Sequence, residues 1–174
     1  LLLRLYMYRQ LTSLRHVNLS SNLLTGEIPT AISTMPQLQV VDLASNRFVG
    51  SLLSISPGAK SLQLLRVDLN SLSGTLSSEL PSLTTLSSLS ASHNRISGSL
   101  PRITDSRLRE FQFDTNQISG GVPVELAGWR RLERISVGNN PLAGSLPSQL
   151  GLISTIRSLR VDNAQLEGAL PTQL

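Results

Sequence analysis

NLSSNLLTGEIP, residues 18–29, introduces a pattern that returns with small changes along the rest of the chain. Its asparagine recurs at intervals of 24 residues, with one interval of 22, at Asn22, Asn46, Asn70, Asn94, Asn116 and Asn140. A glycine follows each asparagine four residues later, and Gly168 continues this rhythm in a seventh unit, where Ala164 replaces the asparagine. A fixed period of this length is the signature of a repeat protein whose units stack.

The 174 residues are therefore expected to form one domain of stacked units. We place the units at residues 11–34, 35–58, 59–82, 83–104, 105–128, 129–152 and 153–174, with residues 1–10 as part of a preceding unit. The chain starts with three leucines and stops within a unit. Because stacked repeats need polar caps at their ends, we interpret the sequence as an interior segment of a longer protein.

Apolar residues alternate ahead of each asparagine, as at Val17 and Leu19, and this alternation predicts a short strand. Strands at constant spacing stack into one parallel sheet, with the rest of each unit as the crossover. Proline follows the glycine in most units, as at Pro29, and favours a turn or 3₁₀ return because it lacks an N–H donor. With 40% hydrophobic but only 3% aromatic residues, the core is predicted to be aliphatic.

The recurring asparagines and glycines are predicted to be structural. At the corner where a strand becomes a turn, a buried asparagine amide bonds backbone groups of its own and the neighbouring coil, so that no buried polar group lacks a partner. The glycine permits a bend or a close approach that a Cβ atom would hinder.

The pattern LxxLxxLxLxxNxLxGxIPxxL, which residues 11–34 follow closely, resembles the leucine-rich repeat, and its GxIP segment resembles the plant-type subclass. The chain is thus similar to the ectodomains of plant receptor-like kinases and receptor-like proteins, and to polygalacturonase-inhibiting proteins. The resemblance implies a curved right-handed solenoid of about seven repeats, in the α/β class, whose inner strand face contacts partners. Departures are Leu53 and Ser77 in place of the proline, Ala164 in place of the asparagine, and the absence of cysteine-paired caps.

Residues between the core positions of the strands are expected to face outward on the concave side in three columns, with neighbours in a column ~4.8 Å apart. The expected partner-binding residues on this face are His16, Val40, Asp42, Leu64, Arg66, Asp68, Glu110, Gln112, Asp114, Arg134, Ser136, Arg160 and Asp162.

Two interpretations of this face stay open. One is a groove for an extended ligand, apolar near Val40 and Leu64 and carboxylate-binding near Arg134 and Arg160, because guanidinium groups suit carboxylates. The other is a solvated sheet whose arginines and aspartates pair with one another. In peptide-sensing relatives an Arg-x-Arg pair on the inner face holds the ligand's C-terminus. The single Arg-x-Arg of this chain, at 107–109, instead flanks a core leucine ahead of the strand.

Asn18-Leu19-Ser20 is the one N-glycosylation sequon in the chain. If the protein is secreted, a glycan at Asn18 would stand on the concave side and cover the N-terminal part of the groove. The alternative is that these residues are simply the ordinary spelling of the repeat.

Composition argues against several other classes of function. There are no cysteines, and the two histidines, His16 and His93, are three strands apart, so neither a metal site nor a cofactor is expected. Ser90, Ser92 and His93 lie close together in sequence, but they are repeat fillers and a turn residue, so no catalytic site and no enzyme activity is predicted. No apolar run reaches the ~18 residues of a membrane span, and no membrane contact is expected.

The net charge of +4 raises nucleic acid as a partner, but the arginines between residues 102 and 160 are spread over strand, edge and return positions rather than one stripe, and stacking aromatics are absent. Nucleic acid is therefore not expected, whereas acidic polysaccharide remains an alternative anionic partner. The leading hypothesis is protein or peptide recognition, with a co-receptor as a further partner, by an extracellular or cell-surface ectodomain. The competing hypotheses are an enzyme inhibitor of the polygalacturonase-inhibitor type and a scaffold subunit of a larger assembly, for which a cytoplasmic location stays open.

Overall fold

The computed structural model describes residues 11–52, 59–76, 85–102 and 106–173. The partial unit expected at residues 1–10 and the departures at Leu53 and Ser77 lie outside the described residues.

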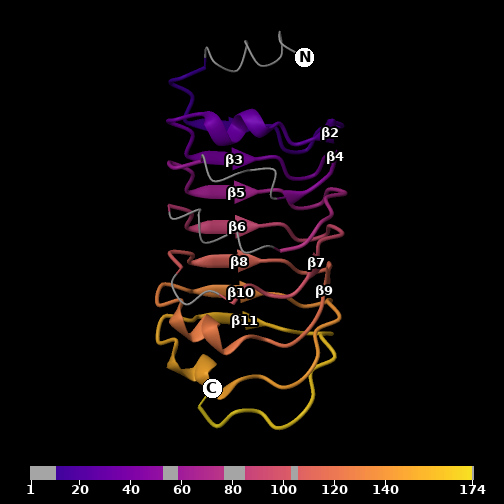
Figure 1. Ribbon diagram of the computed structural model, residues 1–174, viewed down its shortest axis with the longest axis vertical. Coiled ribbons are helices and arrows are strands. Elements are labelled where there is room, and N and C mark those ends of the chain that lie inside the picture. The colour runs from indigo at the N-terminus through magenta and orange to yellow at the C-terminus, as the bar shows by residue number, and fades with distance from the viewer. Residues whose placement is uncertain (1–10, 53–58, 77–84, 103–105, 174) are drawn as a thin grey trace.

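Seven short strands of the described chain form one parallel sheet that runs the length of the molecule, with the two termini at opposite ends (Figure 1). Their order in space follows their order in sequence, as stacked coils require. The strands are β1 His16–Asn18, β3 Val40–Asp42, β5 Leu64–Arg66, β6 Ser88–Ser90, β8 Glu110–Gln112, β10 Arg134–Ser136 and β11 Ser158–Arg160. The predicted leucine-rich repeat solenoid with a parallel sheet is confirmed.

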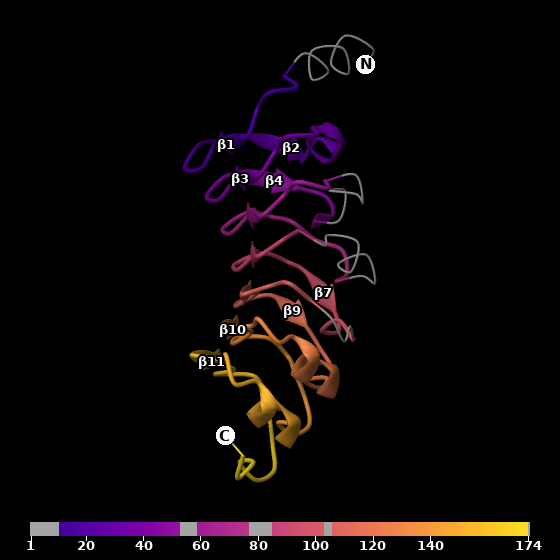
Figure 2. The same cartoon turned by 90° about the vertical axis from the view of Figure 1, so that its left-hand side faces the viewer.

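The return segments lie opposite the sheet, and the stack of coils is curved (Figure 2). Three described returns are 3₁₀-helices: η1 Thr30–Thr34, η4 Val124–Gly128 and η5 Ser148–Leu152. Each begins directly after a proline with extended backbone, at Pro29, Pro123 and Pro147, which confirms the predicted 3₁₀ return.

A second set of strand pairs forms between adjacent units, in the segments that follow the recurring asparagine and lie at or just before the recurring glycine. Strand β2 (Thr25–Glu27) pairs in parallel with β4 (Arg47–Val49), and β7 (Ser97–Gly98) pairs with β9 (Gln117–Ile118). Sequence reasoning did not foresee these pairs, because segments such as Thr25–Glu27 show no apolar alternation and are exposed throughout. These pairs join the first unit to the second and the fourth to the fifth, and isolated bridges at Ser51–Ser73, Thr75–Ser97 and Gly120–Leu142 join further neighbouring coils.

The core is a continuous stack in which leucine, isoleucine and valine side chains dominate, as composition predicts, and it contains one aromatic cluster. Phe111, Phe113 and Trp129 are each 0% exposed. The two phenylalanine rings stack with centroids 4.4 Å apart, and Trp129 meets Phe111 edge-on at 5.5 Å. The aliphatic core expected from composition is therefore interrupted by an aromatic cluster at the junction of two units, which holds three of the chain's six aromatic residues.

Asparagine side chains bond neighbouring coils together at the end of each strand. Nδ2 of Asn140 donates to the carbonyl oxygens of Phe113, Val137 and Gly138 at 2.8–3.0 Å, and its Oδ1 accepts the Ile118 N–H at 2.9 Å. The same set of four bonds, shifted by one coil each time, is made by Asn46, Asn70, Asn94 and Asn116.

The residue before each repeat asparagine has left-handed backbone, which makes this corner tight. The φ angle is +54° at Leu69, +56° at His93 and +53° at Thr115. Such values are unfavourable for branched and bulky residues, so the asparagine bonds hold a strained turn as well as two coils. The marker glycine relieves the second turn of the unit: Gly74, for example, has φ +89°.

Candidate functional site: the concave face

The large sheet presents its three outward columns on one continuous face. The strand register pairs His16 with Val40, Val40 with Leu64, and so on to Arg134 with Ser158. The second column is in register likewise, from the Asn18–Asp42 pair to the Ser136–Arg160 pair. Side chains of equivalent positions therefore stand side by side on adjacent strands, at about the ~4.8 Å strand spacing.

The N-terminal end of this face is partly apolar. Val40 and Leu64 are half-buried register partners on β3 and β5, and Leu69, just beyond β5, is 52% exposed. His16 on β1 is exposed beside them. An apolar pair flanked by polar groups gives this end a small surface that can bury part of a ligand side chain.

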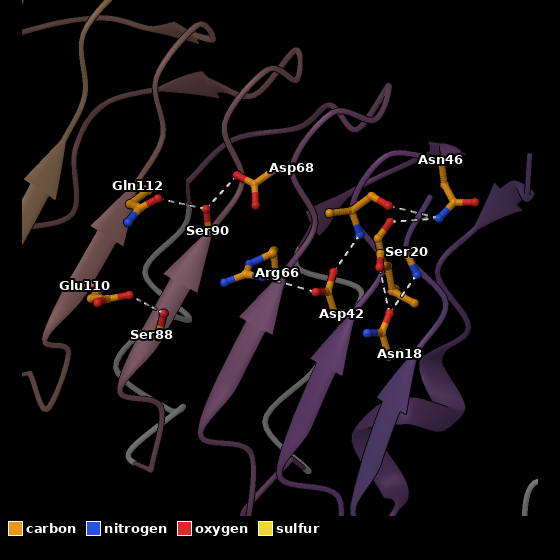
Figure 3. A network of polar contacts seen from close by, with 12 residues as sticks. Asn18, Ser20, Asp42, Asn46, Arg66, Asp68, Ser88, Ser90, Glu110 and Gln112 are labelled. Atoms are coloured by element: carbon orange, nitrogen blue, oxygen red, sulfur yellow. Dashed lines mark hydrogen bonds and ion pairs between the residues drawn. The ribbon is translucent and has the colours of Figure 1, made fainter. Parts of the chain in front are cut away.

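Each arginine of the concave columns has an acidic neighbour. Arg66 Nη1 lies 3.3 Å from Asp42 Oδ2 (Figure 3), Arg134 donates to Glu110, and Arg160 Nε lies 3.5 Å from Asp162 Oδ1. The arginine side chains remain 50–61% exposed, so these pairs add little to stability. Each of these arginine–carboxylate ion pairs uses only part of a guanidinium group that carries five N–H donors. The other donors are left for solvent or a ligand.

Two aspartates of the expected binding set have a structural part as well. Asp68 Oδ1 accepts the Ser90 hydroxyl at 2.6 Å (Figure 3) and also the Ser92 N–H at 2.7 Å. Asp114, two coils further along the stack, makes the equivalent bonds: its Oδ1 accepts the Ser136 hydroxyl at 2.7 Å and the Gly138 N–H at 3.0 Å. Each aspartate thus bonds the end of the following strand, a cross-coil role that sequence reasoning missed.

Ser136 does not fit its expected place in a binding surface. It is 9% exposed, because its hydroxyl is turned into the bond with Asp114 and the strand is covered by its neighbours. Glu110 and Gln112 are half-buried and accept hydroxyl bonds from Ser88 at 3.0 Å and Ser90 at 3.3 Å (Figure 3). The accessible polar groups of the face are therefore chiefly its arginines, with His16 and Asp162.

Asn18 lies exposed at the end of β1. Its Oδ1 accepts both the backbone N–H of Ser20 at 3.0 Å and the Ser20 hydroxyl at 2.7 Å (Figure 3). The amide oxygen of Asn18 is thus hydrogen-bonded within the sequon itself. The amide nitrogen belongs to the same side chain, which is exposed.

The other constellations considered from sequence do not assemble into reactive sites in the described part of the chain. Ser90 bonds Asp68 and Gln112 rather than His93, whose side chain is exposed at its strained turn. No cluster of three or more potential metal ligands occurs among the described residues. No helix among the described residues has the length and apolarity to cross a membrane. Trp129 packs in the core, as its repeat position predicts.

A family model described as Leucine Rich Repeat matches residues 13–35. No curated protein sequence matches the chain. Among solved structures, the ectodomain of the Arabidopsis thaliana receptor kinase GASSHO1/SCHENGEN3 in complex with CASPARIAN STRIP INTEGRITY FACTOR 2 is 32% identical over 93% of this chain and 20% of its own, with a TM-score of 0.87. The Arabidopsis receptor kinase HAESA, in complex with the peptide hormone IDA and the co-receptor SERK1, is 33% identical over 94% of this chain and 28% of its own, with a TM-score of 0.86.

A TDR receptor is 30% identical over 95% of this chain and 29% of its own, with a TM-score of 0.89. The chain therefore spans between a fifth and a third of the length of these receptor structures. Together with the repeat pattern and the parallel sheet, the matches identify the chain as a plant-type leucine-rich repeat protein, similar to the ectodomains of plant receptor kinases.

Proposed function

We propose that this chain is a recognition segment of an extracellular receptor-like ectodomain, which binds a peptide or protein through its concave face. The observation that carries the proposal is the continuous, in-register sheet face with an apolar pair at one end and half-exposed arginines at the other. The matched receptor complexes support the class of partner, since one holds CASPARIAN STRIP INTEGRITY FACTOR 2 and another holds the peptide hormone IDA and the co-receptor SERK1.

The residues assigned to ligand contact are those that the fold leaves accessible. Val40 and Leu64 would bury an apolar ligand side chain, and Arg134 with Arg160 would bind a ligand carboxylate. These two arginines lie diagonally on neighbouring strands, since Arg134 faces Ser158 and Ser136 faces Arg160. Exchange of an exposed intramolecular carboxylate for a ligand carboxylate requires little energy, because such surface pairs contribute only ~0–1 kcal/mol.

The face as a whole does not select a strongly acidic ligand. Its three columns hold five carboxylates against three arginines, so a ligand is expected to present mixed charge with a carboxylate near Arg134. Acidic polysaccharide receives no support from the matched complexes. A non-signalling binder or a scaffold subunit would use the same face, and recognition rather than catalysis is proposed in either case.

The test is selection of peptide ligands on the immobilised chain from a library of twelve-residue peptides with free C-termini. Peptides enriched on the wild type are then measured by calorimetry against the variant Arg134→Ala with Arg160→Ala. We expect the variant to lose at least about tenfold in affinity, the effect of one charge-assisted contact.

The matched control is Arg47→Ala with Arg95→Ala, which removes the same charge from exposed residues outside the concave columns. It should bind the enriched peptides as the wild type does. Failure of the wild type to enrich any peptide, or equal affinities in the wild type and the concave-face variant, would contradict the proposal.

We further propose Asn18 as an N-glycosylation site of the secreted protein, on the grounds of its exposure and its sequon. A glycan there would cover the N-terminal end of the face, at β1. The test is the mass of the peptide that contains Asn18, measured on protein from a plant secretory host. If all of that peptide has the unmodified mass, the assignment is refuted.

A further inference from the structure

Seven of the 13 Lys and Arg residues that the structure describes lie not on the concave face but along one edge of it. The residue that follows the core leucine of each unit enters the sheet just before the strand, and these residues form their own backbone ladder. Gln39 N donates to Arg15 O, Gln63 N to Gln39 O, and the series continues through Ser87, Arg109, Glu133 and Arg157, each bond 2.8 Å long. Along this edge, backbone hydrogen bonds therefore join the coils into one continuous row.

Seven cations lie on this row or within the two residues before the core leucine, against one described carboxylate, Glu133. We call this the basic edge; its cations are Arg15, Lys60, Arg107, Arg109, Arg130, Arg131 and Arg157. All of them are exposed. Five of the eight arginines between residues 102 and 160 belong to this edge, because equivalent positions of successive coils are brought side by side.

A hollow of about 550 Å³ opens in the middle of the basic edge. Four cations line it, Lys60, Arg107, Arg109 and Arg131, and no carboxylate is among its lining residues. Its volume lies in the ~300–1,000 Å³ range of ligand sites. Because every charged residue that lines this hollow is a cation, its potential favours a negatively charged ligand.

Three of these cations have no ion-pair partner among the described residues. Arg109 lies 3.2 Å from Glu133, which also stands 3.9 Å from Arg157, so the single described carboxylate of the edge is already shared. Lys60, Arg107 and Arg131 show no such pair in the described part of the chain.

The remaining lining groups are neutral and hydrogen-bonding. The hydroxyls of Ser61, Thr85 and Ser87 are used by the fold, since they donate to carbonyl oxygens of the preceding coil at 2.6–2.9 Å. The amide side chains of Gln39 and Gln63 complete the lining. Such amides have both a donor and an acceptor and match the backbone of a peptide.

We propose that the basic edge is a second binding site, separate from the concave columns, which takes an acidic peptide segment of a protein partner. Guanidinium groups bind carboxylates in a bidentate manner, and three arginines with a lysine favour closely spaced Asp and Glu side chains. The hollow has no Phe, Tyr or Trp in its lining, so it lacks the stacking platforms that single-stranded nucleic acids use. This site does not depend on the proposed concave-face ligand.

The test uses the 174-residue chain and a synthetic deca-glutamate peptide as the probe, with deca-glutamine as the uncharged control. Affinity is measured by fluorescence anisotropy over a range of salt concentrations. Wild type should bind deca-glutamate but not deca-glutamine, and added salt should weaken binding, because the contacts are between exposed charges. The variant Arg107→Gln with Arg131→Gln should lose about tenfold or more.

Two controls of equal charge change separate this site from others. Arg47→Gln with Arg95→Gln, away from the edge, and Arg134→Ala with Arg160→Ala, on the concave face, should both bind deca-glutamate within about twofold of wild type. If Arg107→Gln with Arg131→Gln fails to fold by circular dichroism, Lys60→Gln with Arg131→Gln takes its place, because both residues are exposed.

Several results would overturn the proposal. They are absence of deca-glutamate binding to wild type, equal loss in all three double variants, or loss confined to the concave-face variant. Tighter binding of a decameric oligogalacturonate or a ten-nucleotide single strand, removed by the same edge variant, would transfer the site to polysaccharide or nucleic acid. A failed peptide selection on the concave face with intact deca-glutamate binding would refute the proposed function and leave this site standing.

Discussion

The first described coil and the coil around Asn140 follow the same sequence pattern but differ sharply in burial. Leu19 is 44% exposed, whereas Val137, at the equivalent position, is 0% exposed. Asn22 is exposed, and among the described residues its side chain bonds only the carbonyls of Leu19 and Ser20, in its own coil. Asn140 is 2% exposed and bonds two coils.

The difference shows that the repeat pattern by itself does not determine what a residue contributes. A coil buries its apolar side chains only against its neighbours, so the same residue type contributes according to its packing in the stack. Mutations at matched positions can measure how far this holds.

The largest effect is expected at Trp129, in the aromatic cluster. Trp129→Ala removes a fully buried side chain that packs edge-on against Phe111. We expect a loss of ~3–5 kcal/mol in the free energy of unfolding, measured by urea titration, as for large aromatic residues replaced in cores. Val124→Ala, which changes a 50% exposed residue of the same return, is the matched control and should have little effect. Similar losses from the two changes would show that the cluster is not a centre of stability.

A smaller loss is expected at Asn140. Asn140→Ala removes three donated bonds and one accepted bond, and leaves the Ile118 N–H and the Phe113 carbonyl without that partner. The expected cost is ~1–3 kcal/mol, the range for unsatisfied buried groups. Thermal and urea unfolding measure it, and an unchanged melting temperature would refute the role assigned to the asparagine bonds.

The smallest effect is expected at Asn22. Asn22→Ala removes two bonds at an exposed corner, where water can replace the amide, so the loss should stay below ~1 kcal/mol. The same unfolding measurements apply. If Asn22→Ala destabilises the chain as much as Asn140→Ala, burial between coils is not the source of the difference.

The sequence was sufficient to predict the sheet, the 3₁₀ returns and the concave columns, because each depends on the period of the backbone. Such features repeat, and a position such as Leu65 is identified by its equivalents in other units. The aromatic cluster was missed because composition averages over the chain, whereas Phe111, Phe113 and Trp129 come from one unit and the start of the next.

Contacts between side chains of different coils were harder to predict. The bonds from Ser90 and Ser92 to Asp68 depend on which way each side chain turns, and the repeat pattern does not specify this. The basic edge was missed for a different reason: its cations occupy three adjacent columns rather than one. A charge count by column on both sides of the core leucine would have found it.

The strand register is unchanged across the one short unit. Ser88 and Glu110 are 22 residues apart, whereas the other register partners are 24 apart, and yet they pair as the others do. The spacing of the large sheet is therefore independent of unit length, and the difference in length falls outside its strands. Changes in return length can thus alter the bend of the molecule while the recognition columns keep their spacing, so that shape and specificity can be varied separately.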